Sequence, residues 1–313
     1  MQLRRYGFGI WALALSVMVS AESSANSRVF TDVHGEVTIP AEPQRIVSLQ
    51  DHVLTMSLVE LGAPVAGSAG RMGDDGKPYL RGVQDLLGVD FHNSEIEYVG
   101  WTDLEKVVAV NPDLIITTHY ESAEMLAQLR LIAPTVTINQ NQSLLGFMHD
   151  VADVSGRMDV YEARLARYQD RLAEARKAIP DASNISISVI NSRDGVLNYW
   201  ASYGALTQVM DDIGFARPAI NAQVSDGNME VSQERLQDVD ADYIIDTFGI
   251  SWGETPQDAR NRMAEVLPNW CSVLEACQNG RYLVFPRTFA FSTSFASLEL
   301  MTQMLVSHVA GRQ

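Results

Sequence analysis

The sequence predicts an α/β protein built from two lobes that one long helix joins. Three observations support this fold class. Short apolar runs alternate with amphipathic helical patterns in both halves of the 313-residue chain, and a long charged segment separates the halves. One segment of the first half also has a counterpart with the same order of features in the second half. Alternating strands and helices are typical of parallel sheets covered by helices on both faces.

The apolar runs that we interpret as strands are short and are bounded by polar or turn-forming residues. Strands are predicted at residues 45–49, 65–68, 114–118, 135–138, 185–190, 243–246 and 282–285. Helices are predicted at residues 52–61, 103–110, 121–132, 144–155, 160–179, 206–213, 232–239, 260–266 and 297–310.

The long segment at 160–179 is amphipathic throughout, and Pro180 ends it because proline cannot continue a helix. A helix of about 20 residues is ~30 Å long. Since it lies between two α/β patterns, we interpret it as the connection between lobes; the alternative is a surface helix of a single domain. The predicted organisation is an N-terminal lobe at 28–152, an interlobe helix at 153–180 and a C-terminal lobe at 181–313.

The repeated design lies in residues 103–116 and 232–245. Each segment begins with a good N-capping residue, Asp103 or Ser232, and continues as a helix with an early Glu. A tight turn containing Asp follows, and then a buried strand. This match predicts two lobes of similar construction.

The first 21 residues predict a secretory signal peptide. Arg4 and Arg5 precede an apolar run at 10–19, and small residues at 19–21 suit a signal peptidase. The run is too short to span a bilayer, which needs ~20 residues. A second acceptable cleavage site follows Ala25, and no Cys lies at the junction to carry a lipid. We therefore expect a protein that is secreted through a cleaved signal peptide.

The composition narrows the function. The formal net charge of −16 argues against a nucleic-acid partner, which requires a basic surface. The chain has two cysteines, Cys271 and Cys277, which we expect to pair in an oxidising compartment. Free thiols and a metal site are the alternatives, although residues 265–283 contain no His. No nucleophile-elbow, P-loop or zincin motif is present, so we do not expect an enzyme.

Candidate ligand contacts follow the predicted strands, because ligands of open α/β sheets bind beyond the carboxyl ends of the strands. Three arginines occupy such positions, Arg71, Arg193 and Arg287. A guanidinium group suits anionic oxygens, and aromatic rings supply rigid contact area. The aromatic candidates are Trp101, Tyr120, Trp200, Tyr203 and Trp252. Surface ion pairs for the arginines and core positions for the aromatics are the alternatives. The polar, glycine-ended segment 198–204 predicts that Trp200 and Tyr203 are exposed.

The sequence also resembles a known family. The stretch 99–116 (VGWTDLEKVVAVNPDLII) is similar to the signature of class III (cluster A) periplasmic binding proteins, which serve ferric siderophores, haem and cobalamin. The opening at 45–67, the single interlobe helix and the segment 243–245 are similar to the same family. Residues 77–100 look most like its iron–siderophore branch.

The resemblance implies two Rossmann-like lobes, with parallel central sheets and a ligand in the cleft between them. It also implies docking to an inner-membrane ABC permease through one Glu of each lobe, which here are Glu105 and Glu234. The alternative is that both are ordinary first-turn residues that favour the helix dipole. The loop between Gly100 and Leu104, which contains Trp101, is shorter than the usual form.

The predicted function is the capture of a ferric siderophore by a monomeric periplasmic protein and its delivery to the permease. Because the iron arrives chelated, we expect no protein metal ligands and no cofactor. Haem, with His52, His119 or Tyr120 as axial ligand, and cobalamin are alternatives within the same fold. A periplasmic interaction protein that does not transport, or a periplasmic α/β enzyme, is a further alternative.

Overall fold

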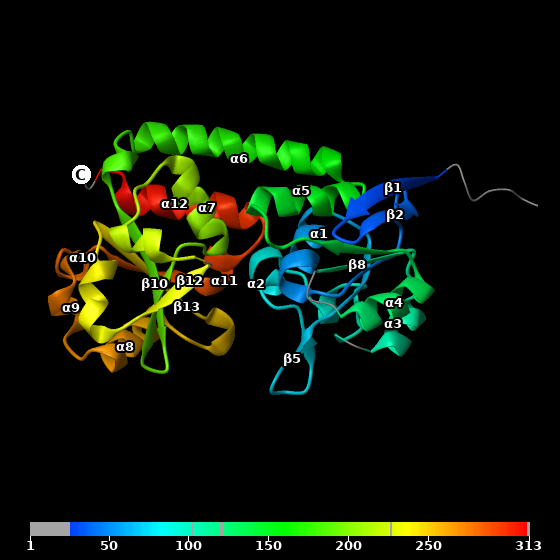
Figure 1. The fold of residues 1–313 in the computed structure, drawn as a ribbon, viewed down its shortest axis with the longest axis horizontal. Helices are drawn as coiled ribbons and strands as arrows, with labels where there is room; N and C mark the ends of the chain where they lie inside the picture. The colour runs from blue at the N-terminus through cyan, green and yellow to red at the C-terminus, as the bar shows by residue number, and fades with distance from the viewer. Residues whose placement is uncertain (1–25, 102, 119–121, 226, 312–313) are drawn as a thin grey trace, which may run out of the picture.

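The computed structural model describes residues 26–101, 103–118, 122–225 and 227–311. It has two five-stranded sheets, one in each half of the chain, and Figure 1 shows them side by side beneath one long helix. The α/β fold class is therefore confirmed. The predicted signal peptide and Tyr120 lie outside the described residues. No helix in the described ranges is both long and apolar enough to cross a bilayer.

The N-terminal sheet is parallel throughout, in the order β7-β4-β3-β8-β9. Its strands are β3 (Ile46–Ser48), β4 (Val65–Ser68), β7 (Glu97–Tyr98), β8 (Leu114–Thr118) and β9 (Thr135–Ile138). The helices of this lobe are α1 (Met56–Glu60), α2 (Val83–Leu87), α3 (Leu104–Val110), α4 (Ala123–Ile132) and α5 (Leu144–Val154). Two antiparallel pairs that were not predicted are β1 (Ser27–Asp32) with β2 (Gly35–Pro40), and β5 (Arg71–Met72) with β6 (Pro78–Tyr79).

The C-terminal sheet has the order β12-β11-β10-β13-β14. Its strands are β10 (Ile187–Arg193), β11 (Val196–Trp200), β12 (Asn228–Val231), β13 (Tyr243–Phe248) and β14 (Tyr282–Pro286). The expected parallel centre is present in β10, β13 and β14, and the antiparallel strands β11 and β12 extend it. The extension begins at Asp194 and Gly195, whose φ angles of 53° and 75° allow a tight hairpin turn.

The helices of the C-terminal lobe are α7 (Gly204–Ile213), α8 (Pro256–Val266), α9 (Trp270–Val273), α10 (Glu275–Gln278), α11 (Arg287–Phe291) and α12 (Phe295–Val309). Single-turn or 3-10 segments are η2 (Phe91–Asn93), η3 (Ala182–Asn184), η4 (Ala219–Gln223), η5 (Gln233–Val239) and η6 (Ile250–Trp252). The predicted helix at 232–239 is thus a 3-10 helix.

The long helix α6 (Met158–Ala178) runs along both lobes (Figure 1). Its buried face consists of Tyr161, Tyr168, Leu172 and Ala175, which recur at helical spacing. The Tyr161 hydroxyl donates to the Leu145 carbonyl of α5, and the Tyr168 hydroxyl donates to the Asp212 carboxylate of α7 at 2.7 Å. The helix is therefore fixed by hydrogen bonds to both halves of the molecule.

A second connection between the halves lies at the start of α12. The carboxylate of Glu60, at the end of α1, accepts hydrogen bonds from the backbone N–H groups of Phe295 and Ala296, both at 2.7 Å. The Ser57 hydroxyl donates to the Thr293 carbonyl at 2.9 Å. The N-terminal half thus caps a helix of the C-terminal half.

The repeated design of the two halves is visible in matching contacts. Asp113, just before β8, accepts hydrogen bonds from the backbone N–H groups of Gln44 and Arg45 at the start of β3. Asp242, just before β13, accepts one from the backbone N–H of Ser186 at the start of β10. In each sheet this carboxylate fixes two neighbouring parallel strands at the same end, which agrees with the predicted similar construction of the two lobes.

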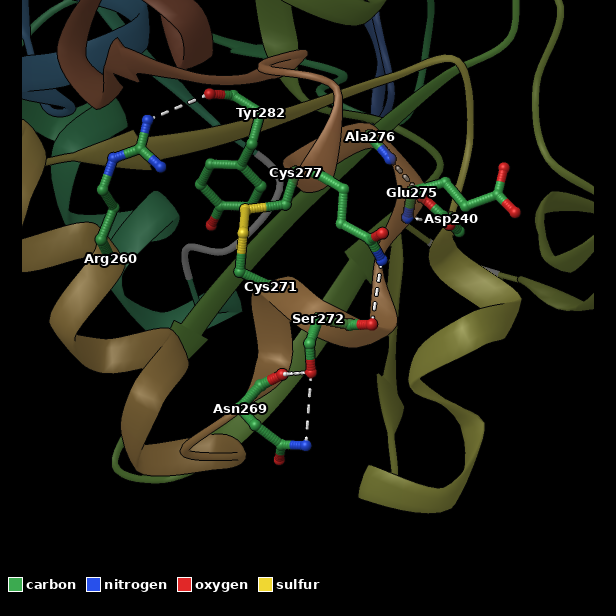
Figure 2. The surroundings of a disulfide bond; sticks show 10 residues. Asp240, Arg260, Asn269, Cys271, Ser272, Glu275, Ala276, Cys277 and Tyr282 are labelled. Atoms are coloured by element: carbon green, nitrogen blue, oxygen red, sulfur yellow. Dashed lines mark hydrogen bonds between the residues drawn. A yellow bond between two sulfur atoms is a disulfide. The ribbon is translucent and has the colours of Figure 1, made fainter.

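The predicted disulfide joins Cys271 of α9 to Cys277 of α10 (Figure 2). The carboxylate of Asp240 accepts hydrogen bonds from the backbone N–H groups of Glu275 and Ala276 at the start of α10. The disulfide and this cap hold two short helices that have too few residues to be stable alone.

Candidate ligand-binding cleft

A cavity of about 610 Å³ lies between the two halves of the molecule. The N-terminal half contributes Gln50, His52 and Phe147 to its lining, and the C-terminal half contributes Trp200 and Phe291. A volume of this size is typical of sites for small molecules. The position agrees with the rule that ligands of α/β sheets bind beyond the carboxyl ends of the strands.

The backbone after β3 places His52 at this cavity. Residues Asp51–Thr55 form a π-helical turn, a rare conformation that is frequent at functional sites. The Gln50 side chain caps the turn by accepting a hydrogen bond from the Val53 N–H at 2.6 Å. The His52 ring stacks on Phe291 of α11, with 5.6 Å between ring centroids. The two lobes therefore meet at an aromatic contact in the floor of the cleft.

A cluster of three arginines surrounds this floor. The Arg71 Nε lies 3.4 Å from the Asp51 Oδ2, and the Arg81 Nε lies 4.0 Å from the same oxygen. Arg81 and Arg287 line a smaller cavity of about 60 Å³ together with His52. We call Arg71, Arg81 and Arg287, with Asp51, the arginine cluster. It is a local concentration of positive charge in a chain of net charge −16.

Burial and the nearby arginines together shift the pKa values of His52 and Asp51. Burial, with a further contribution from Arg81, Arg287 and Arg71, lowers the pKa of His52 to about 3. His52 is therefore neutral at physiological pH. Burial raises the pKa of the Asp51 carboxyl, and the nearby Arg81 and Arg71 oppose this shift.

Arg287 is held in place by Tyr203. Its Nη1 donates to the Tyr203 hydroxyl at 2.7 Å, and that hydroxyl pairs with the Thr247 Oγ1 at 2.7 Å. The guanidinium carbon lies 5.1 Å from the centre of the Phe291 ring and 6.0 Å from that of Trp252. The predicted Arg287 thus lines two cavities beside the cleft, and hydrogen bonds and cation–π contacts fix its position.

The expected exposure of Tyr203 is wrong. Its side chain is fully buried, because the segment from β11 to the start of α7 passes beneath α11. A Cβ on Gly204 would collide with the backbone of Phe291, so the polar, glycine-rich pattern reflects close packing of two backbones and not exposure. Tyr203 acts on the cleft through Arg287.

Trp200 lines the cleft from the C-terminal half, and Arg193 lines a cavity next to it. Trp200 is partly exposed, and its Nε1 donates to the Asn191 side chain at 3.0 Å. Arg193 is at the tip of the β10–β11 hairpin, pairs with Asp194 at 3.8 Å and lies 5.9 Å from the Trp252 ring centre. These residues also line a neighbouring cavity of about 540 Å³. Trp252 itself is 57% exposed.

Trp101 belongs to the arginine cluster's surroundings. Its Nε1 donates to the Gly70 carbonyl at 3.0 Å, and the Arg71 guanidinium lies 5.4 Å from its ring centre.

Arg81 was not predicted from the sequence as a site residue. It follows the two-residue strand β6, which is too short for a periodic pattern. The signal that could have found it is its place within 77–100, the stretch similar to the iron–siderophore branch.

Of the predicted docking residues, Glu105 lies in the first turn of α3, and Glu234 lies in the first turn of η5. Both side chains are exposed. Their elements precede β8 and β13, which occupy matching places in the two sheets.

The ranges that the structure describes contain no group of three or more His, Cys, Asp and Glu residues able to hold a metal ion.

Comparison with known proteins identifies the class of this protein. The profile of the periplasmic binding protein family matches residues 67–281, so the chain belongs to that family. The family is one of solute-binding proteins, and the family prediction is confirmed.

Relatives and solved structures agree with this assignment. YfiY of Bacillus subtilis (strain 168), a probable siderophore-binding lipoprotein, is 28% identical over 254 residues, or 74% of each chain. FepB of Escherichia coli O6:H1, a ferric enterobactin-binding periplasmic protein, is 28% identical over 247 residues, or 76% of each chain. The crystal structure of Staphylococcus aureus SirA complexed with staphyloferrin B has the same fold, with a TM-score of 0.73, 20% identity and coverage of 91% of this chain and 100% of that one.

Proposed function

We propose that this protein captures a ferric siderophore in the interlobe cleft and delivers it to an inner-membrane ABC permease. The observation that carries the proposal is the arginine cluster at the floor of the cleft, with aromatic rings beside it. Siderophores bind iron through oxygen donors, and guanidinium groups bind such oxygens. The named relatives bind siderophores or ferric enterobactin, which supports the same ligand class here.

The proposed contacts come from both lobes, which we assign to 28–152 and 181–313 with the connecting helix at 153–180. Arg71, Arg81 and Trp101 would contact the complex from one side. Arg193, Trp200, Trp252 and Arg287 would contact it from the other, and Tyr120 completes the predicted set. The protein contributes no iron ligand, since the chelator holds the metal, and no catalytic step is involved.

The proposed partner is the permease, with the exposed Glu105 and Glu234 as docking residues on matching elements. We place the protein in the periplasm as a monomer, after removal of the predicted signal peptide. Because hydrogen bonds fix α6 to both halves, we propose that closure around the ligand is small.

Ligand capture is tested by tryptophan fluorescence, since Trp200 lines the cleft, Trp252 lies beside Arg287 and Trp101 lies beside Arg71. The mature protein is titrated with ferric siderophores, haemin and cobalamin. We expect saturable quenching by a ferric siderophore. Quenching by haemin or cobalamin alone would show that the ligand is not a ferric siderophore. The absence of quenching by all three classes of ligand would contradict the proposal.

A pair of variants locates the binding site. Arg287→Gln removes a cleft guanidinium and should weaken binding on the order of tenfold or more, the loss expected for a charge-assisted hydrogen bond. Arg130→Gln is the matched control, because Arg130 is exposed on α4, away from the cleft lining. Equal effects of the two variants would place the ligand elsewhere.

Docking is tested separately with the cognate permease in proteoliposomes. Glu105→Ala and Glu234→Ala should each reduce stimulation of its ATPase by the loaded protein, while the ligand Kd stays unchanged. Glu124→Ala, which changes an exposed first-turn Glu of α4, is the control. Full stimulation by the Glu105→Ala, Glu234→Ala double variant would refute these docking residues.

A further inference from the structure

Asp51 is a buried carboxylate among arginines. Its residue is fully buried, and its Oδ2 is shared by Arg71 at 3.4 Å and Arg81 at 4.0 Å. It lies at the first position of the π-helical turn after β3, next to His52. The local backbone thus places one negative charge beneath the cleft.

The three arginines reach this point from separate parts of the fold. Arg71 begins β5, Arg81 follows β6, and Arg287 begins α11 in the C-terminal half. Arg71 and Arg81 lie at the same oxygen of Asp51, and Arg81 and Arg287 line one small cavity together with His52. Their charges repel, so such a convergence requires an anion to stabilise it.

Asp51 supplies only part of that compensation. Three guanidinium groups and one carboxylate leave two uncompensated positive charges, and neutral His52 adds none. In the described ranges the buried Arg81 Nε donates no hydrogen bond. This unused donor and the excess of positive charge favour the entry of an anion beside the cluster.

We propose that Asp51 is a specificity-determining residue that sets the charge of the arginine cluster, and that the cluster selects ferric complexes with a net negative charge. This inference rests on the proposed function and narrows its ligand class. Catecholate and carboxylate chelators give anionic ferric complexes. Three hydroxamates neutralise the ferric ion and give an uncharged one, which gains less from the cluster.

The physical reason is the dependence of a Coulomb interaction on the product of the charges. Replacing Asp51 by Asn keeps the shape of the side chain and raises the net charge of the cluster from two to three. Replacing Arg71 by Gln lowers it from two to one. For each unit of charge in the cluster, the Kd of an anionic complex a few ångströms away should change on the order of tenfold. The Kd of an uncharged complex of the same size should change little.

The experiment compares the wild type with Asp51→Asn, Arg71→Gln and the double variant, whose net charge equals that of the wild type. The probes are ferric complexes of two tripodal chelators on one scaffold, ending in three catechols or three hydroxamates, and ferric citrate as the carboxylate probe. Fluorescence titration gives the Kd of each complex, and circular dichroism verifies folding. The measured quantity is the selectivity, the ratio of the hydroxamate Kd to the Kd of each anionic complex.

We expect the selectivity for anionic complexes to rise on the order of tenfold in Asp51→Asn, to fall similarly in Arg71→Gln and to return to the wild-type value in the double variant. A preference for catecholate or for citrate identifies which anionic donor the site takes. A purely structural role of Asp51 would change every Kd by one factor and leave the selectivity constant, which would overturn the inference but not the proposed function. Failure of all three complexes to bind the wild type would overturn both.

Discussion

Removing the Glu60 carboxylate should destabilise the whole molecule, because this side chain of the N-terminal half caps α12 of the C-terminal half. Its two oxygens accept the backbone N–H groups of Phe295 and Ala296 at 2.7 Å each. The Ser294 hydroxyl satisfies the next N–H, that of Ser297. Glu60→Ala therefore leaves two N–H groups at the start of α12 without an acceptor.

The magnitude follows from these two hydrogen bonds. An unsatisfied buried donor costs about 1–3 kcal/mol, so two give roughly 2–6 kcal/mol. The loss is offset in part, because Glu60→Ala also removes the cost of burying a carboxylate. Burial raises the pKa of Glu60, whereas the backbone donors and Arg164 lower it. Arg164, at 3.7 Å and partly exposed, adds little. We expect a decrease of about 3 kcal/mol in the free energy of unfolding, and about half as much for Glu60→Gln, which keeps one acceptor.

Urea unfolding followed by circular dichroism measures this quantity. The matched control is Glu162→Ala, at an exposed position of α6, which should remain within about 0.5 kcal/mol of the wild type. If Glu60→Ala were as stable as the control, the capping contact would contribute nothing, and the reasoning from its geometry would be refuted.

Three further predictions concern other contacts. Tyr203→Phe should weaken ligand binding several-fold, because Arg287 loses its hydroxyl acceptor; an unchanged Kd in the fluorescence titration would contradict the positioning role. Burial raises the pKa of the Asp246 carboxyl to about 7 from an unfolded value near 3.8. The protonated carboxyl therefore stabilises the folded state fully below about pH 3.8, and this stabilisation is lost as the pH rises to about 7. Asp246→Asn should flatten that part of the curve of unfolding free energy against pH, and an unchanged slope would refute the assignment. Reduction of the Cys271–Cys277 disulfide, which closes a short loop, should lower the unfolding free energy by about 2 kcal/mol, as measured by urea unfolding with and without reductant, and no change would refute it.

Much of the fold could be predicted because its central strands are continuous apolar runs. The predicted strands at 65–68, 114–118 and 135–138 have the observed bounds. The hairpins were missed because their strands are short or exposed and follow no clear period. One signal was present, since Asp194 and Gly195 are a typical hairpin-turn pair.

The candidate site could be predicted less completely. Arg71 and Arg287 were found, because both follow predicted strands, and the structure places both in the arginine cluster. Arg81 was missed, because its strand has only two residues. Tyr203 was assigned the wrong exposure, because a polar, glycine-ended segment is compatible both with a surface loop and with the close backbone packing observed beneath α11.

The sequence by itself determined the α/β class, the two lobes of similar design, the connecting helix and the family. These features depend on local periodicity, on capping residues and on a motif, and each of these signals comes from residues that are close together in the sequence. Only the tertiary structure decided that Asp51 lies between Arg71 and Arg81, and that Glu60 caps a helix 235 positions away. Such contacts join elements that pack together only in the folded chain, so no local pattern in the sequence encodes them.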